Sequence, residues 1–297
     1  MAIEGNCASD SLQVFKIPHE CEQIALCGGP YSNFAAVEQF LAETADVTYR
    51  FCLGDVGGFG PQPDRTIELL KQAGVICLQG NYDDAVGNGL ADCGCGYADP
   101  RDRHFAQLSY DYTYTRTAPH HRAWMQTLPT LIQLQWRDRN ILLCHGSPDK
   151  VNEFVWESET DDAKILDYLQ RYGVEGICAT HSGLPWLRQV ARPSATHQTS
   201  NLGFWFNVGV LGRPANTGNP AVTYGLLSWP DLVSAPKPHL QSMTYDVSAT
   251  VSAMRREGLP EAFIESLETG IWTTCAEILP TAERREDQRL AAVRTVV

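Results

Sequence analysis

The first third of the chain alternates short apolar runs with segments whose apolar residues recur at helical spacing. The runs have the length of buried strands, and the segments between them suit amphipathic helices. The expected strands are residues 24–27, 49–53 and 75–78, and the expected helices are residues 34–41 and 64–73. Because such alternation is typical of parallel sheets, this region is predicted to form a doubly wound sheet.

The pattern changes in the rest of the chain. A helical region at 105–128 is interrupted near Pro119, and the apolar runs 131–136 and 141–144 flank polar residues 137–140, which favours a β-hairpin. A further strand is expected at 177–179, and a second sheet is expected from 204–208, 223–229 and 239–245. Further helices are expected at 163–172, 247–256 and 260–269.

The chain shows no internal repeat and no linker rich in Gly, Ser or Pro. We therefore predict that residues 1–297 form one domain, with a core at about 24–270 and a C-terminal extension at 271–297. Residues 1–22 are expected to be an irregular lead-in.

Composition narrows the classes of function. The net charge of −12 would repel a nucleic-acid backbone, so no nucleic-acid partner is expected. No apolar run reaches the roughly 18 residues that a membrane span needs, and the N-terminus lacks the pattern of a signal peptide. Several of the 10 cysteines lie inside apolar runs, which suits free thiols in a reducing cytoplasm. The oligomeric state is not indicated.

Four polar residues stand where strand-like runs end: Asp55, Asn81, His145 and His181. The carboxyl ends of sheet strands are where α/β proteins bind ligands. A carboxylate, an amide oxygen and two imidazoles suit a divalent ion such as Mn²⁺, Fe²⁺ or Zn²⁺. Taken singly, Asn81 is equally a turn residue and His145 a buried core histidine, so the argument depends on the set.

The joint spacing of these residues resembles that of the calcineurin-like metallophosphoesterases, especially their small bacterial phosphodiesterase and phosphatase branch. The matching blocks, in order, are Gly54-Asp55, Gly80-Asn81 with Asp83, His145-Gly146, Thr180-His181 and, approximately, Asn207 to Pro214. The resemblance implies an α/β (α+β) fold in which a two-sheet β-sandwich is flanked by helices.

The departures from the family pattern concern one half of its two-metal site. Gly29 and Tyr31 stand where the family has its first Asp and His, Tyr82 replaces the catalytic His, and Gly183 replaces the last His. The ligands of the second metal survive as Asn81, His145 and His181, with Asp55 beside them. The resemblance therefore implies a mononuclear site that holds one divalent transition metal: Fe, Mn or Zn.

Other candidates surround this set. Tyr82, Asp83 and Tyr31 are candidate catalytic residues by position, although a phenol with a pKa of about 10 is a poor acid at neutral pH. Tyr31 and Tyr82 could instead orient a substrate or, once deprotonated, bind a ferric ion. Arg213 could contact an anionic substrate. Cys93 and Cys95, in a Gly-rich loop that could overhang the site, are candidate substrate contacts; the alternatives are a structural role and a pair of thiolate ligands.

Three functions are compatible with this sequence. The one we expect is a metal-dependent hydrolase acting on a phosphate ester or a related anionic small molecule through one ion. The alternatives are a lyase or redox enzyme with a single Fe-type ion, and a non-catalytic metal- or ligand-binding relative. Survival of a whole ligand set speaks against an inert protein, and loss of the first-metal positions speaks against a standard phosphodiesterase.

Overall fold

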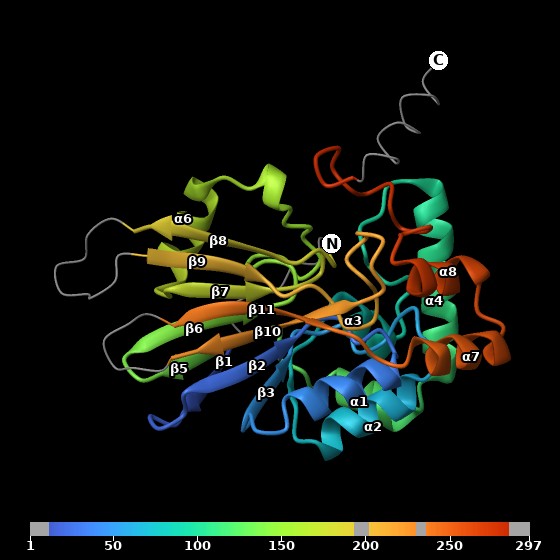
Figure 1. Cartoon of the computed structure of the whole chain (residues 1–297), viewed down its shortest axis with the longest axis horizontal. Coiled ribbons are helices and arrows are strands. Elements are labelled where there is room, and N and C mark those ends of the chain that lie inside the picture. The colour runs from blue at the N-terminus through green and yellow to red at the C-terminus, as the bar shows by residue number, and fades with distance from the viewer. Residues whose placement is uncertain (1–11, 193–201, 230–235, 285–297) are drawn as a thin grey trace, which may run out of the picture.

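The computed structural model describes residues 12–192, 202–229 and 236–284, which fold into two stacked sheets with helices outside them (Figure 1). The six-stranded sheet has the order β1 (Leu12–Ile17), β5 (Leu131–Trp136), β6 (Arg139–Cys144), β7 (Gly176–Ala179), β9 (Leu202–Asn207) and β8 (Trp186–Ala191). The five-stranded sheet has the order β11 (Lys237–Met243), β10 (Val222–Ser228), β2 (Gln23–Cys27), β3 (Tyr49–Cys52) and β4 (Ile76–Cys77).

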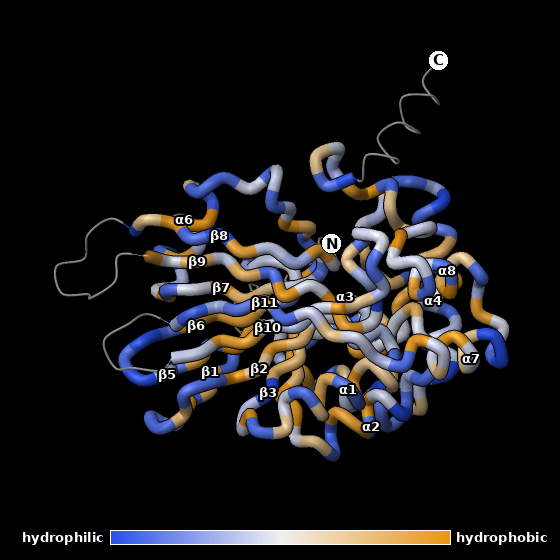
Figure 2. Tube along the Cα trace, in the orientation of Figure 1, coloured by the Kyte–Doolittle hydropathy of each residue, from blue (hydrophilic) through white to orange (hydrophobic). Residues whose placement is uncertain are grey.

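The period of two along each strand sends side chains to opposite faces of its sheet. In β2, Ile24 and Leu26 point into the core between the sheets, whereas Ala25 and Cys27 face the helical layer. In β6, Ile141 and Leu143 enter the same central core. Strands that are buried on both faces read as continuous apolar runs, which is why these runs could be recognised in the sequence (Figure 2).

Helices cover the outer faces of both sheets. The helices are α1 (Phe34–Glu43), α2 (Pro63–Gln72), α3 (Asn81–Asn88), α4 (Pro100–Arg116), α5 (Pro119–Met125), α6 (Asp162–Tyr172), α7 (Val247–Glu257) and α8 (Glu261–Thr269), with a short 3₁₀ turn at Glu157–Glu159. Helix α6 packs Ile165 and Leu169 against Trp205 of the six-stranded sheet. In Figure 1, α4, α7 and α8 gather at the end of the molecule opposite the hairpin that joins β5 and β6.

The two-sheet sandwich implied by the family resemblance is confirmed, and the doubly wound sheet predicted from the first third is wrong. Strands β2, β3 and β4 are indeed parallel, but β10 adds to the free edge of β2 in antiparallel register, with Gly225 opposite Leu26. The expectation that 204–208, 223–229 and 239–245 form a second sheet is wrong as well, because β10 and β11 extend the sheet of β2, β3 and β4, whereas β9 lies in the six-stranded sheet. The predicted hairpin is present, and its turn is Arg137-Asp138.

Two strands were not predicted. The supposed lead-in contains β1, which pairs in parallel with β5 so that Leu12 lies opposite Leu131. β8 pairs with β9 at the other edge. Both are edge strands with mostly exposed or half-buried residues, so their apolar pattern is weak. The assignment of residues 1–297 to one domain stays a prediction.

Within the described residues, no helix combines the length and the apolar character needed to cross a membrane. The cytoplasmic location expected from the sequence stays a prediction.

Candidate metal centre

The four predicted ligand residues meet where strands of the two sheets end side by side. Asp55 follows β3 and Asn81 begins α3 directly after β4, whereas His145 and His181 follow β6 and β7 of the other sheet. All four side chains are buried. The sandwich thus brings together residues that lie far apart in the sequence.

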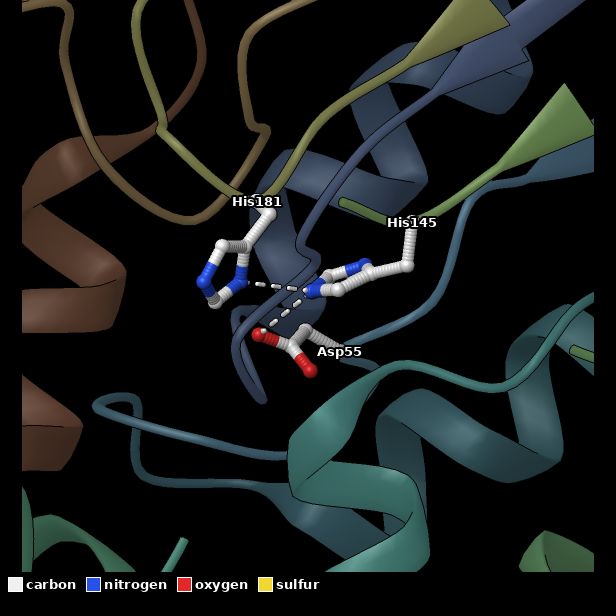
Figure 3. A group of neighbouring side chains, drawn as sticks. All are labelled: Asp55, His145 and His181. Atoms are coloured by element: carbon white, nitrogen blue, oxygen red, sulfur yellow. Dashed lines mark hydrogen bonds and ion pairs between the residues drawn. The ribbon is translucent and has the colours of Figure 1, made fainter. Parts of the chain in front are cut away.

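The ligand atoms converge on one point. His145 Nε2 lies 3.3 Å from Asp55 Oδ2, 3.2 Å from Asn81 Oδ1 and 3.1 Å from His181 Nδ1. Figure 3 shows Asp55, His145 and His181 pointing toward one another. Two ligand atoms bonded to one ion at about 2.1 Å lie roughly 3.0–3.4 Å apart, so this spacing fits a shared transition-metal ion.

Neighbouring hydrogen bonds orient two of these ligands. His145 Nδ1 is 2.7 Å from the carbonyl oxygen of Leu53, to which it donates, and this leaves the lone pair on Nε2 for a cation. The Asn81 amide donates to the carbonyl oxygen of Cys93 at 2.8 Å and to Cys95 Sγ at 3.3 Å. Its Oδ1 therefore faces His145. The converging atoms are mostly acceptors, and a cation is the partner that satisfies them together.

Electrostatics agree with this chemistry at Asp55 and His181, whereas His145 requires a cation to displace its proton. Burial disfavours the charged form of Asp55, but His145 and His181 more than offset it and hold the pKa of Asp55 below its usual value. Burial and the neighbouring His145 lower the pKa of His181 to about 3, so its imidazole is neutral at physiological pH, as a metal ligand must be. Burial also opposes the charged form of His145, yet Asp55 raises the pKa of this histidine.

The backbone is constrained at the same point. Asp55 has φ +58° and His181 has φ +46°, a left-handed conformation that non-glycine residues rarely adopt. The Asp83 carboxylate accepts hydrogen bonds from the backbone N–H groups of Asp55 at 2.7 Å, Val56 at 3.0 Å and Gly80 at 2.9 Å. Burial, followed by the charge of Asp55, raises the pKa of Asp83 to about 7. The catalytic role expected of Asp83 stays a prediction; its contacts are those of a residue that positions Asp55.

The two candidate tyrosines lie in different surroundings. The Tyr82 hydroxyl is buried against α4, 2.9 Å from Ser109 Oγ. The Tyr31 ring lies over Gly29, so that a Cβ added to Gly29 would come within 2.9 Å of the ring. Tyr31 also lines a pocket beside His181. Burial raises the pKa of both phenols, which disfavours the phenolate that a ferric ion would require. A catalytic role for either tyrosine stays a prediction.

The pocket beside His181 is narrow, with a cavity volume of about 20 Å³. We call its lining rings the aromatic wall, which consists of Tyr31, Phe59, Tyr97, Phe154 and Trp272. Trp272 belongs to residues 271–284, here called the closing segment, and its indole Nε1 donates to the carbonyl oxygen of Pro214 at 2.6 Å. An added Cβ on Gly183 would come within 3.1 Å of the Trp272 ring. Nothing in the local sequence of the closing segment signalled this contact.

Arg213 is the cation of this pocket. Its guanidinium lies 4.1 Å from the centre of the Trp272 ring and donates to the carbonyl oxygen of Thr274. The residue is only 7% exposed, and within the described chain no carboxylate lies close enough for an ion pair. Burial lowers the pKa of Arg213. A buried, unneutralised guanidinium is suited to bind an anion.

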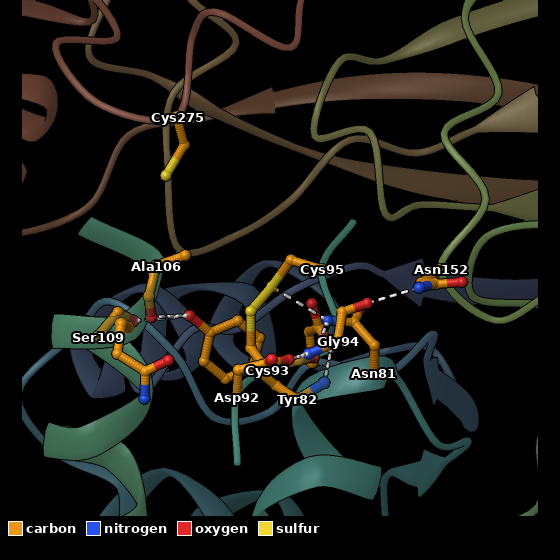
Figure 4. Close-up of a disulfide and its surroundings, with 12 residues drawn as sticks. Asn81, Tyr82, Asp92, Cys93, Gly94, Cys95, Ala106, Ser109, Asn152 and Cys275 are labelled. Atoms are coloured by element: carbon orange, nitrogen blue, oxygen red, sulfur yellow. Dashed lines mark hydrogen bonds between the residues drawn. A yellow bond between two sulfur atoms is a disulfide. The ribbon is translucent and has the colours of Figure 1, made fainter. Parts of the chain in front are cut away.

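Cys93 and Cys95 are joined by a disulfide, so the alternative in which they supply two thiolate ligands is wrong for this structure. The disulfide lies above Asn81, and Asn152 donates to the carbonyl oxygen of Gly94 on its other side (Figure 4). Residues 92–97, here called the disulfide loop, line a separate cavity of about 360 Å³ together with Arg103 and Asn152.

Comparison with known proteins agrees with this geometry. The family model described as calcineurin-like phosphoesterase matches residues 18–208. An uncharacterised protein of Methanocaldococcus jannaschii, MJ0912, is 22% identical over 254 residues, which cover 83% of this chain and 98% of the relative.

Two solved structures share the fold. A metallophosphoesterase from Sphaerobacter thermophilus has a TM-score of 0.62 at 22% identity, over 84% of this chain and 99% of its own. The hypothetical protein PH1004 from Pyrococcus horikoshii has a TM-score of 0.65 at 18% identity, over 84% of this chain and 98% of its own. Since the family model spans well over half of the sequence and contains all four converging residues, the chain belongs to the calcineurin-like phosphoesterase family.

Proposed function

We propose that this protein is a metal-dependent phosphoesterase that hydrolyses a small phosphate ester or a related anionic compound through one divalent transition-metal ion. Asp55, Asn81, His145 and His181 would hold the ion. The observation that carries the mononuclear assignment is the occupation of the other half of the family's site by aromatic rings. The identity of the ion, Fe, Mn or Zn, is left to elemental analysis.

Two glycines support that assignment. At Gly29, where the family has its first Asp, the Tyr31 ring and the Val210 side chain fill the space into which a side chain would project. At Gly183, where the family has its last His, the Trp272 ring does the same. The Trp272 ring offers no lone pair in place of the lost imidazole, and burial raises the pKa of the Tyr31 phenol and disfavours the phenolate, so a second ion would lack ligands there.

The other residues of the pocket would bind and orient the substrate and exclude water. When bound, a divalent ion supplies Lewis acidity that activates water and neutralises charge on phosphoryl oxygens. Arg213 would bind a second oxygen of the anion and orient it toward the ligand set. The aromatic wall would exclude bulk water, which strengthens these electrostatic contacts.

The pocket offers the leaving group little acid catalysis. The Tyr82 hydroxyl is hydrogen-bonded to Ser109, and burial raises its pKa. The substrate would therefore carry a leaving group that departs without a proton, such as an aryl alcohol or a phosphate. To test the proposal, chelator-treated protein would be reloaded with Mn²⁺, Fe²⁺ or Zn²⁺ and assayed on p-nitrophenyl phosphate, bis(p-nitrophenyl) phosphate and an alkyl phosphate. Metal-dependent cleavage of the aryl esters alone is expected.

A second function is favoured by one observation. A cavity of about 20 Å³ beside His181 admits a water molecule and little more, so a metal-binding relative without catalysis is the competing proposal. Full metal occupancy without cleavage of any of these esters would support it and contradict the hydrolase.

Tyr82→Phe is expected to leave the turnover of the reloaded enzyme within about threefold of wild type, because the hydroxyl is engaged by Ser109 and not by the ligand set. General acid catalysis typically contributes about 10²–10⁴-fold, so steady-state kinetics on the aryl ester separate the two roles. A loss of turnover in that range would show that Tyr82 is a catalytic residue. Ser109→Ala is the companion variant: it keeps the phenol but removes this hydrogen bond and the acceptor of the Phe59 backbone N–H, so its stability is measured beside its turnover.

Reduction of the Cys93–Cys95 disulfide is expected to weaken metal binding by about tenfold. The Asn81 amide is oriented by Cys93 and Cys95, and loss of such orienting contacts typically costs about 10- to 100-fold in metal affinity. Competition with a chromogenic chelator, with and without a phosphine reductant, measures the change. A variant with both Cys93→Ser and Cys95→Ser should not respond to reductant, and equal affinities in both wild-type forms would contradict the prediction.

A further inference from the structure

A second cluster of metal-ligating side chains lies outside the site described above, between α2 and α5. Glu68 of α2 and the adjacent His120 and His121 of α5 each offer one ligand atom, and these atoms lie within 4.8 Å of one another. His121 Nε2 is 3.5 Å from Glu68 Oε1 and 3.9 Å from Asp64 Oδ1. We call this group the α2–α5 cluster. It shares no residue and no helix or strand with the candidate metal centre.

His121 makes this cluster unlike an ordinary surface group of charges. Its side chain is only 2% exposed, and neither ring nitrogen has a hydrogen-bond partner among the described residues. A buried polar atom without a partner is unfavourable and rare, and it calls for an explanation such as a bound ion. The Nε2 atom points toward the carboxylates of Glu68 and Asp64 at distances too long for good hydrogen bonds.

The neighbouring groups form a coherent donor set. The His120 and His121 rings lie with their centres 4.0 Å apart and their planes tilted by 43°. Asp64 uses Oδ1 to accept the backbone N–H of Ala118 at 2.9 Å, so it is held close to the cluster by the residue that precedes α5. Two imidazoles and one or two carboxylates are the ligands preferred by Zn²⁺ and its neighbours in the first transition row.

We propose that Glu68, His120 and His121, with Asp64 beside them, bind a divalent transition-metal ion that ties α5 to α2. An ion pair of His121 with Glu68 alone would give His120 no role, whereas a shared ion uses both imidazoles and the carboxylate. Helix α5 has only 7 residues and is too short to be stable by itself. A metal tie to the longer α2 would stabilise it in place. His120 and Glu68 are exposed, so the ion can exchange with solvent.

Zn²⁺ binding by the full-length protein tests the proposal. Chelator-treated protein dialysed against excess Zn²⁺ is expected to retain two equivalents of Zn²⁺, one at the candidate metal centre and one at the α2–α5 cluster. In the His145→Ala variant one equivalent should remain, and Glu68→Gln or His120→Ala combined with His145→Ala should remove it. His104→Ala, which removes an exposed histidine of α4, is the matched control and should change nothing.

Thermal unfolding gives a second measurement that does not depend on turnover. Zn²⁺ at about 100 times its dissociation constant is expected to raise the melting temperature of His145→Ala by roughly 5 °C, and to leave the double variant with Glu68→Gln unchanged. Circular dichroism of each variant checks that it is folded. Zn²⁺ retention that is the same with and without Glu68 and His120, or no retained Zn²⁺ in folded His145→Ala, would overturn the proposal. Neither result depends on the phosphoesterase activity.

Discussion

His145→Ala is expected to abolish metal-dependent ester cleavage and to lower the metal content of the candidate metal centre by one equivalent. His145 Nε2 is the atom against which Asp55, Asn81 and His181 all converge. Its removal leaves two oxygens and one imidazole, which are no longer held around a common point. Without the ion, the Lewis acidity that would activate water is lost.

Elemental analysis and initial rates measure this result on the same preparation. The sheets supply the core of the fold, so the far-ultraviolet circular dichroism spectrum is expected to match that of wild type. His104→Ala serves as the control, since it removes an exposed imidazole from α4. Turnover that persists in metal-depleted His145→Ala would show that the chemistry lies elsewhere, and a loss of two equivalents would contradict the mononuclear site.

Arg213→Met is expected to lower kcat/KM for an anionic substrate by roughly 30- to 5,000-fold while leaving the metal content unchanged. Truncating one partner of a buried, hydrogen-bonded charge pair typically costs about 2–5 kcal/mol. Arg213 is buried, faces no carboxylate among the described residues, and lines the same pocket as His181. Arg213→Lys should recover only part of the loss, because an ammonium keeps the charge without the planar fork.

The chain offers a matched control for this experiment. Arg188 also lies over a tryptophan, 5.7 Å from the centre of the Trp186 ring, and its guanidinium also donates to backbone carbonyls. It is outside the pocket and more exposed. Arg188→Met should therefore leave kcat/KM unchanged. Equal losses in the two variants, or a loss of metal in Arg213→Met, would assign Arg213 a structural role.

The convergence of the four candidate ligands could be predicted because its signal is local. Each of Asp55, Asn81, His145 and His181 follows an apolar run, and the run predicts both the strand and the point at which it ends. The conformation at Asp55, by contrast, depends on the Asp83 carboxylate accepting its backbone N–H, a contact between α3 and the loop after β3. Spacing alone placed Asp83 among the catalytic candidates and did not indicate this contact.

The surroundings of the centre could not be predicted, because they come from contacts between distant segments. Position suggested a catalytic phenol at Tyr82, but its hydroxyl partner is Ser109, on a helix that belongs to none of the matched motifs. Trp272 reaches Gly183 only after the whole sandwich has formed. The pairing of Cys93 with Cys95 likewise depends on a loop whose composition allows either free thiols or a disulfide.

The closing segment sets the smallest piece of chain that can hold this site. A protein cut back to the matched residues 18–208 would keep all four ligands. It would lose β10, which is hydrogen-bonded along β2. The edge of the parallel strands β2, β3 and β4 would then be unpaired at β2. It would also lose Arg213 and Trp272, and bulk water would then reach His181. A fusion protein that is meant to keep this site should therefore include the chain at least as far as Leu279, which packs beside Trp272.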